Sequence, residues 1–263
     1  MNTQPHFPLP AGASLYYALL YAAQSSRDAM CLVNAFIQEM KSIAVSVNEK
    51  SVAIAKLNWW STEISQTFKG YPHHPLSILL SSVIEHFGLA ENEFQLIIQS
   101  CLIDLEYQYS TEQQKEIYFR SNYGAMLNLL SCTTARTLAP KTFITHLSAM
   151  LQTIWEIKHA GVDSHRTQSY FGQSDPLKLT NVLKIHSEFA KAQFNQAMLS
   201  IKAQDRYPQL SLIILANLNH KLLDEIIRSN FNVLTQRISL TPIKKLWITW
   251  RTNAQEKKIK LIK

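Results

Sequence analysis

Hydrophobic residues recur every three or four positions along most of this chain, and strict alternation of apolar and polar residues does not persist. The first spacing marks one face of an α-helix, whereas alternation would indicate a half-buried strand. One such face holds Ala53, Leu57, Trp60 and Ile64. With only 6 glycines and 9 prolines, the sequence also offers few turns for β-hairpins. We therefore predict an all-α fold.

Breaks in this periodicity divide the chain into helices. Gly70 and Pro72 end one helix, and Pro75 suits the start of the next. No linker, repeat or low-complexity block interrupts the pattern, so we expect one domain at 14–251, between a Pro-rich arm at 1–13 and a basic tail at 252–263. Further helices are predicted at 14–23, from 27 onward, at 75–87, 94–105, 177–201 and 210–231.

The formal net charge is +7, and much of the excess lies near the C-terminus, from Lys244 and Lys245 onward. A basic end is commonly just solvated, and no zinc-finger, RNA-recognition or Gly-rich loop motif accompanies it, so we expect no nucleic-acid partner. The three cysteines, Cys31, Cys101 and Cys132, fit neither a disulfide framework nor a zinc site. We expect reduced, buried thiols in a cytoplasmic protein.

No uncharged apolar run reaches the roughly 18–20 residues that a membrane span needs. We therefore expect a soluble protein or one that binds a membrane peripherally. Trp247 and Trp250 stand beside several lysines, which suits an anionic membrane surface. The same pattern equally suits a packed last helix with a solvated end.

The most informative stretch runs from Lys56 to Ile64 and continues through the turn at 70–76. Adjacent tryptophans, Trp59 and Trp60, precede Glu63 and then a Gly-x-Pro-x-His-Pro turn. This run resembles the corresponding segment of the squalene/phytoene synthase family. The alternative interpretation is a core aromatic pair beside an ordinary turn between two helices.

The resemblance spans nearly the whole chain, from about Ser14 to Arg251. It includes the aromatic pair after Ser14, a Tyr118–Gly124 helix whose glycine allows close packing, and the segment Arg237–Arg251. Enzymes of this family join two isoprenyl diphosphates head to head in an all-α bundle around a central cavity. Mg²⁺ ions are held there between two aspartate motifs on facing helices. The resemblance thus implies this fold and, where the motifs are intact, this chemistry.

The first aspartate motif is degenerate in this chain. Counting back from Trp59 and Trp60, its three aspartate positions hold Lys41, Ser42 and Val45, and the family's arginine position holds Gln38. The chemistry needs carboxylates one helical turn apart, because they hold the Mg²⁺ ions that pull on the leaving diphosphate. Lys41 is a cation and cannot ligate Mg²⁺.

Two placements compete for the second motif. Leu179–Lys184 looks like the family's Leu-Thr-Asn-Ile-Leu-Arg, but the interval from Gly124 favours the register Leu147–Tyr170. In that register the family's Gln, Arg and closing Tyr fall on Gln152, Lys158 and Tyr170.

The two metal positions of this second register hold His159 and Asp163. A His and an Asp four residues apart can bind a divalent ion, although imidazole favours Zn²⁺ or Fe²⁺ over Mg²⁺. A pair at this spacing is more often a surface pair. Asp104 keeps an Asp-Leu pair of the family, and a solvated or capped carboxylate explains it equally well.

Our first hypothesis is a catalytically silent member without a cofactor. It would bind an isoprenyl diphosphate or another lipid, or a protein partner, since divergent family members include mitochondrial complex I assembly factors. Its candidate substrate- or phosphate-binding residues are Gln38, Lys41, Gln152, Lys158 and Tyr170. Lys41 and Lys158 can hold a phosphate as point charges. Alternatively, both lysines could extend to solvent from a collapsed cavity.

The second hypothesis is an active prenyltransferase with rearranged Mg²⁺ ligands, namely His159 and Asp163 with Asp104 or Glu39. The third is an unrelated all-α interaction protein. A structure without a central cavity lined by Lys41 and Lys158 would favour that third hypothesis.

Overall fold

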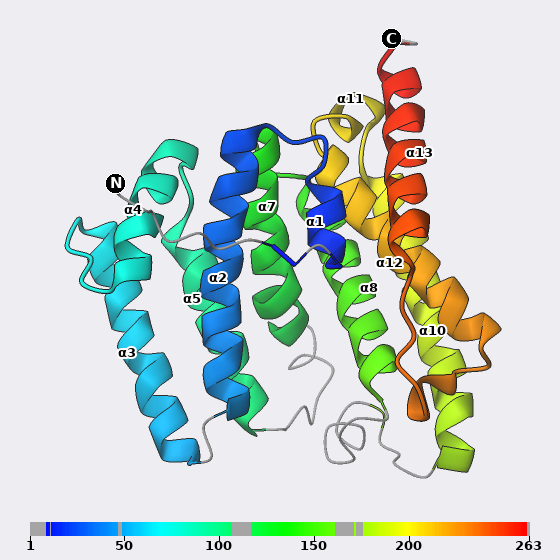
Figure 1. Cartoon of the computed structure of the whole chain (residues 1–263), viewed down its shortest axis with the longest axis horizontal. Coiled ribbons are helices and arrows are strands. Elements are labelled where there is room, and N and C mark those ends of the chain that lie inside the picture. The colour runs from blue at the N-terminus through cyan, green and yellow to red at the C-terminus, as the bar shows by residue number, and fades with distance from the viewer. Residues whose placement is uncertain are drawn as a thin grey trace.

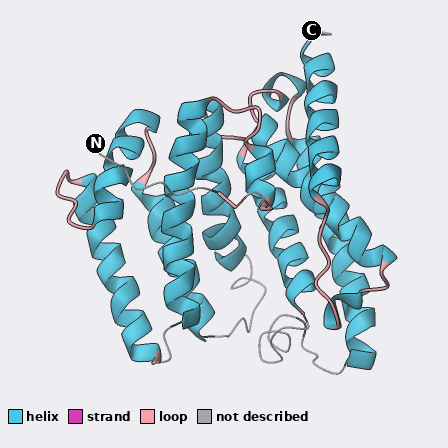
Figure 2. Cartoon of the chain, in the orientation of Figure 1, coloured by secondary structure: helices cyan, strands magenta, loops and turns pink. Residues whose placement is uncertain are grey.

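The computed structural model describes residues 9–10, 12–46, 49–106, 117–160, 171 and 176–261. Every regular element within these residues is helical (Figure 2), which confirms the predicted fold class. The elements are α1 (Ser14–Ala18), α2 (Gln24–Ser46), α3 (Lys50–Phe68), α4 (Pro75–Phe87), α5 (Glu91–Glu106), the π-helix η1 (Arg120–Gly124), α7 (Ala125–Ala135), α8 (Lys141–His159), α10 (Pro176–Ser200), α11 (Ala203–Arg206), α12 (Leu210–Arg228), the 3₁₀-helix η2 (Asn232–Leu234) and α13 (Pro242–Leu261).

The helices form two groups with α7 between them (Figure 1). Helices α2 to α5 make up one group, and α8, α10, α12 and α13 make up the other. In the first group α5 packs against α2, α3, α7 and η1, while in the second α10 lies along α8. Because η1 contacts both α5 and α8, it joins the two groups.

The stretch that carries the family resemblance forms a closed joint between α3 and α4. The Glu63 side chain is buried, and its Oε1 accepts the backbone N–H of His73 at 2.8 Å and of His74 at 2.7 Å. The Trp60 ring centroid lies 4.6 Å from that of His74. Burial alone would raise the pKa of Glu63, but these donated hydrogen bonds lower it overall. The tryptophan–glutamate pattern therefore fixes how two helices meet.

Several helix ends differ from the predictions. Helix α1 ends at Ala18 rather than 23, because the next N–H groups bond three residues back and tighten the chain into a turn. Helix α12 ends at Arg228 rather than 231, because Asn230 and Phe231 adopt positive φ angles of 53° and 57°. Pro75 does start α4, and there the His74 ring accepts the Leu76 N–H at 3.1 Å.

Gly124 does not serve the close packing that we expected. The atoms nearest to a Cβ there belong to Phe119 and Arg120, at 3.7–3.9 Å, which is ordinary van der Waals contact. The cysteines are free, as predicted. Only Cys101 is fully buried, whereas Cys31 and Cys132 are half-buried beside the core-facing stripes of their helices.

The last helix runs straight through the boundary predicted between domain and tail at residue 251. Thr252, Asn253 and Glu256 are buried in α13, and Glu256 accepts two hydrogen bonds from Arg206, at 2.7 and 2.8 Å. Lys245 is also buried, so this lysine is not part of a solvated basic end. Within the described part of the chain, no helix is both long and apolar enough to cross a bilayer.

Candidate functional site

A chain of hydrogen-bonded polar side chains crosses the centre of the bundle. Tyr118 Oη donates to Asp104 Oδ1 at 2.8 Å, and Asn122 Nδ2 lies 3.5 Å from the same hydroxyl. Asn122 Nδ2 also donates to Gln152 Oε1 at 2.9 Å, and Gln152 Nε2 donates to Glu156 Oε1 at 2.9 Å. We call these five residues the polar chain. It connects α5, the helix at 117–124 and α8, and satisfies groups that would otherwise be costly to bury.

Lys41 approaches the Asp104 end of the polar chain from α2. Burial lowers the pKa of Lys41, and the neighbouring Cys101 and Asp104 partly oppose that shift. Its Nζ lies 5.6 Å from the centroid of the Tyr123 ring. Burial, and next the charge of Asp104, raise the pKa of the Cys101 thiol to about 12. The residue at a predicted aspartate position is thus a cation beside a carboxylate.

The neighbouring α2 residues of the first motif lie outside this arrangement. Gln38 and Glu39 are exposed, and Ser42 Oγ donates to the backbone carbonyl of Glu39 at 2.8 Å. Of the substrate-binding candidates, the structure therefore brings Gln152 into the polar chain and Lys41 to its end. It leaves Gln38 at the surface.

Lys158 lies in a different environment, among positive charges. Burial lowers the pKa of Lys158, and the charges of Arg237 and Lys245 lower it further. The pKa of Lys245 is lowered by burial and then by Arg237. Lys245 Nζ donates to the backbone carbonyl of Gly12, and Arg237 is exposed. We call Lys158, Arg237 and Lys245 the cation cluster. Among the described residues, no carboxylate forms an ion pair with any of them.

His159 ends α8 next to Lys158. Its Nδ1 lies 2.7 Å from the carbonyl oxygen of Trp155, and the two rings are 4.5 Å apart. Because a carbonyl can only accept, Nδ1 carries the proton of the neutral ring and a lone pair remains on Nε2. Asp163 and Tyr170 lie outside the described residues, so the His159–Asp163 pairing stays a prediction. Within the described ranges, no three His, Cys, Asp or Glu side chains group as metal ligands would.

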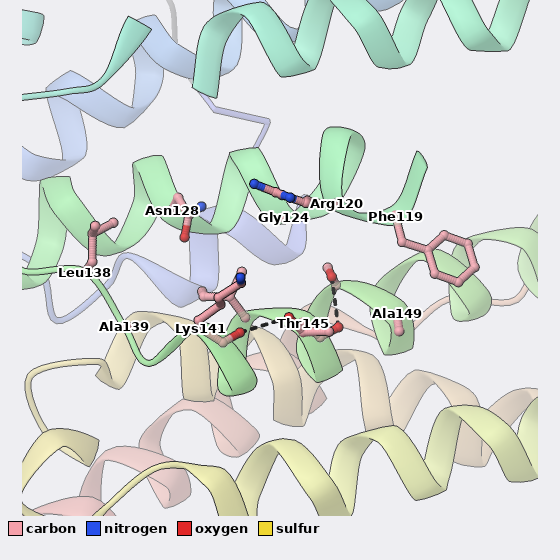
Figure 3. Close-up of a pocket in the computed structure, with 11 residues that line it drawn as sticks. Phe119, Arg120, Gly124, Asn128, Leu138, Ala139, Lys141, Thr145 and Ala149 are labelled. Carbon is pink, nitrogen blue, oxygen red and sulfur yellow. Dashed lines mark hydrogen bonds between the residues drawn. The ribbon is translucent and has the colours of Figure 1, made fainter. Parts of the chain in front are cut away.

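A pocket of about 370 Å³ opens between the η1–α7 helix and the first half of α8 (Figure 3). Arg120 and Lys141 contribute positive charge to it, and Leu138 and Ile144 contribute apolar surface. None of the predicted site residues lines this pocket. The titratable groups that act on Lys41 are Cys101 and Asp104, whereas those that act on Lys158 are Arg237 and Lys245.

Arg237 and Lys245 were not among the site residues predicted from sequence, although both lie in a segment that carried the family resemblance. The signal that could have found Lys245 is its helical spacing. Lys245, Ile248, Thr249 and Thr252 are three or four positions apart and share the buried face of α13. A buried lysine is unusual and suggests a specific role. Grouping Lys245 with the solvated lysines of the C-terminus concealed its buried position.

The sequence profile of the squalene/phytoene synthase family matches residues 10–181, more than half of the chain. The chain belongs to the squalene/phytoene synthase family. Solved structures agree on the fold at low identity. A dehydrosqualene synthase in complex with ligand superposes with a TM-score of 0.75 at 16% identity, over 93% of this chain and 92% of that one. Squalene synthase HpnC from Alicyclobacillus acidocaldarius gives 0.67 at 16% identity, over 82% and 88%.

Two curated relatives of this family member point to different roles. One is the NADH dehydrogenase (ubiquinone) complex I assembly factor 6 of Mus musculus, 26% identical over 114 residues, or 43% of this chain. The other is a presqualene diphosphate synthase of Rhodopseudomonas palustris, 28% identical over 101 residues, or 38% of this chain. The matches span 34% and 36% of the lengths of those proteins.

Proposed function

We propose that this protein binds an isoprenyl diphosphate, or another lipid with a phosphate head group, and does not catalyse Mg²⁺-dependent condensation. The observation that carries the proposal is the cation cluster. Burial lowers the pKa of Lys158 and of Lys245, nearby positive charges lower both further, and no carboxylate among the described residues forms an ion pair with the cluster. Like charges held close together cost free energy, and a bound polyanion offsets that cost.

The described residues at the first motif do not fit a Mg²⁺ cluster. Lys41 is a cation at a position that would need an anion, and Asp104 already accepts a hydrogen bond from Tyr118 at 2.8 Å. Mg²⁺ demands oxygen ligands in near-octahedral geometry, which a lysine cannot supply. A diphosphate would therefore be held by side-chain cations directly. Lysine acts here as a point charge, and Arg237 can offer paired N–H donors.

Isothermal titration calorimetry with inorganic pyrophosphate and with farnesyl diphosphate, both in EDTA, tests this proposal. We expect binding without metal, and Lys158→Met should weaken it about tenfold or more, because a hydrogen bond to a charged group contributes about 1.5–3 kcal/mol. Lys141→Met is the matched control, since Lys141 is exposed and lines the separate pocket. Binding that requires Mg²⁺, or equal loss in both variants, would contradict the proposal.

An active prenyltransferase is the second candidate, and the tautomer of His159 favours it. With Nδ1 donating to Trp155, Nε2 has the lone pair that a metal ligand needs. Incubation with farnesyl and geranylgeranyl diphosphates and Mg²⁺ or Mn²⁺ separates the two candidates. We expect no condensation product, and turnover that Asp163→Asn abolishes would establish the enzyme instead.

A further inference from the structure

The first turns of α13 expose large apolar side chains to solvent on one side of the helix. Ile243 is 79% exposed, Leu246 50%, Trp247 51% and Trp250 61%. Their spacing of three, four and seven residues places them on one helical face. We call this set the apolar stripe. Two tryptophans and two aliphatic residues gathered at the surface are more than scattered exposure would produce.

The rest of α13 holds this stripe in its outward position. Ile248, Thr249 and Thr252 on the opposite face are buried, so the helix cannot turn the stripe inward without exposing them. Arg206 and Glu256 fix the second half of the helix with two hydrogen bonds. The helix lies at the edge of the molecule, and its C-terminal end extends past the other helices (Figure 1). The stripe is therefore presented by a rigid, accessible element.

The charges around the stripe are positive. Lys244, Arg251, Lys257 and Lys258 are exposed on α13, and the Arg251 guanidinium lies 5.1 Å from the centroid of the Trp247 ring. Within the described part of α13 the single carboxylate is Glu256, which is buried against Arg206. From α12, Glu225 faces this side, and Lys244 and Arg228 both form ion pairs with it.

We propose that the apolar stripe and the surrounding cations dock this protein on an anionic lipid bilayer. Tryptophan suits the membrane–water interface because one end of its ring system is apolar and the other donates a hydrogen bond. Lysine stems can lie along the apolar zone while their ammonium groups reach the lipid phosphates. Charge complementarity favours a surface rich in phosphates over a neutral one. This inference concerns the outer face of α13 and does not depend on the cation cluster.

Flotation of the full-length protein with vesicles tests the proposal. One set contains phosphatidylcholine alone, and in the other phosphatidylglycerol replaces part of it. We expect binding to the second set, and the double variant Trp247→Ser with Trp250→Ser should weaken it at least about tenfold, through the loss of buried apolar area. Trp59→Ser is the matched control, because Trp59 is 49% exposed on the distant α3, and it should leave binding unchanged.

The charge contribution is tested with Lys257→Gln combined with Lys258→Gln. Each lysine near an anionic surface contributes about 1 kcal/mol, or about fivefold, so the pair should weaken binding by about 25-fold. Lys50→Gln with Lys56→Gln, which removes two exposed lysines of α3, should have no such effect. Circular dichroism melting curves confirm that each variant is folded.

Three outcomes would overturn the proposal. The first is equal binding to both vesicle sets, and the second is binding that the tryptophan variant retains. The third is a dimer, seen by light scattering, that the tryptophan variant abolishes, which would assign the stripe to a second copy of this chain. The double tryptophan variant should bind pyrophosphate as the unmodified protein does, so failure of vesicle binding and failure of diphosphate binding are distinguishable.

Discussion

Lys41 and Lys158 both occupy positions where the family resemblance places residues of the diphosphate–metal site, yet their surroundings are opposite. Lys41 reaches the end of a polar chain in which Asp104 supplies a nearby negative charge. Burial lowers the pKa of Lys158, and the positive charges of Arg237 and Lys245 lower it further. In the first region a carboxylate lies beside the lysine, whereas in the second no carboxylate among the described residues pairs with the cations.

The difference separates what stabilises the fold from what is available for binding. The side chains of the polar chain hydrogen-bond to one another, so removing one of them leaves a buried neighbour without its hydrogen-bond partner. In the cation cluster Lys245 donates to the carbonyl of Gly12, but no described carboxylate pairs with Lys158, so substituting Lys158 should affect ligands more than folding. The predictions below use that contrast, beginning with the largest expected change.

Replacing Asp104 by Asn should be the most damaging change. It removes the carboxylate beside half-buried Lys41 and weakens the acceptor for Tyr118, so the free energy of unfolding should fall by about 2–3 kcal/mol. Urea titration followed by circular dichroism measures this value. Asp28→Asn is the control, because Asp28 is exposed, and it should change stability by no more than about 0.5 kcal/mol. Equal effects of the two variants would show that the polar chain is not a structural unit.

Replacing Lys158 by Met should stabilise the protein, in contrast to the replacement of Asp104. The substitution keeps most of the side-chain volume and removes one of three like charges, so the free energy of unfolding should rise by about 0.5–1 kcal/mol. The same urea titration checks it, at low and at high salt. Because salt screens the repulsion, the gain should shrink as salt is added. A loss of stability would mean that Lys158 has a partner in the folded protein.

The pH profile of stability should reveal both the burial of these lysines and the repulsion between the cations. Lys158 and Lys245 have folded-state pKa values below the usual 10.5, so the unfolded chain binds more protons between those values and 10.5. Stability should therefore rise as pH increases through that window. As the pH rises toward 10.5, Lys158→Met should show a shallower rise in stability than the unmodified protein. Identical slopes in thermal melts across this range would argue against the coupling.

Gln38→Ala should produce the smallest change. Gln38 is exposed, and no hydrogen bond in the described residues commits it, so stability should stay within about 0.5 kcal/mol. Pyrophosphate affinity measured by calorimetry should also stay the same. A clear loss of affinity would place α2 at the anion site and would unite the two regions that the structure keeps apart.

Much of the fold was predictable from the sequence, because apolar spacing and proline positions act locally. Pro75 and the face through Ala53, Leu57 and Trp60 gave α4 and α3 directly. The cation cluster was not predictable in this way. It brings Lys158 together with residues far along the chain. Helical spacing can place Lys245 on the buried face of α13, but it does not say which residues that face meets. Likewise, no local sequence pattern predicts the π-helical turn at Arg120–Gly124.

The carboxylate of Glu63 has a consequence for how such proteins are recognised. It accepts two backbone N–H groups at the turn between α3 and α4, and this structural role does not depend on any catalytic chemistry. The tryptophan–glutamate motif that carries the family resemblance therefore reports the fold and not the activity. Active and inactive members of the family must therefore be distinguished by the charged residues at the two aspartate-motif positions.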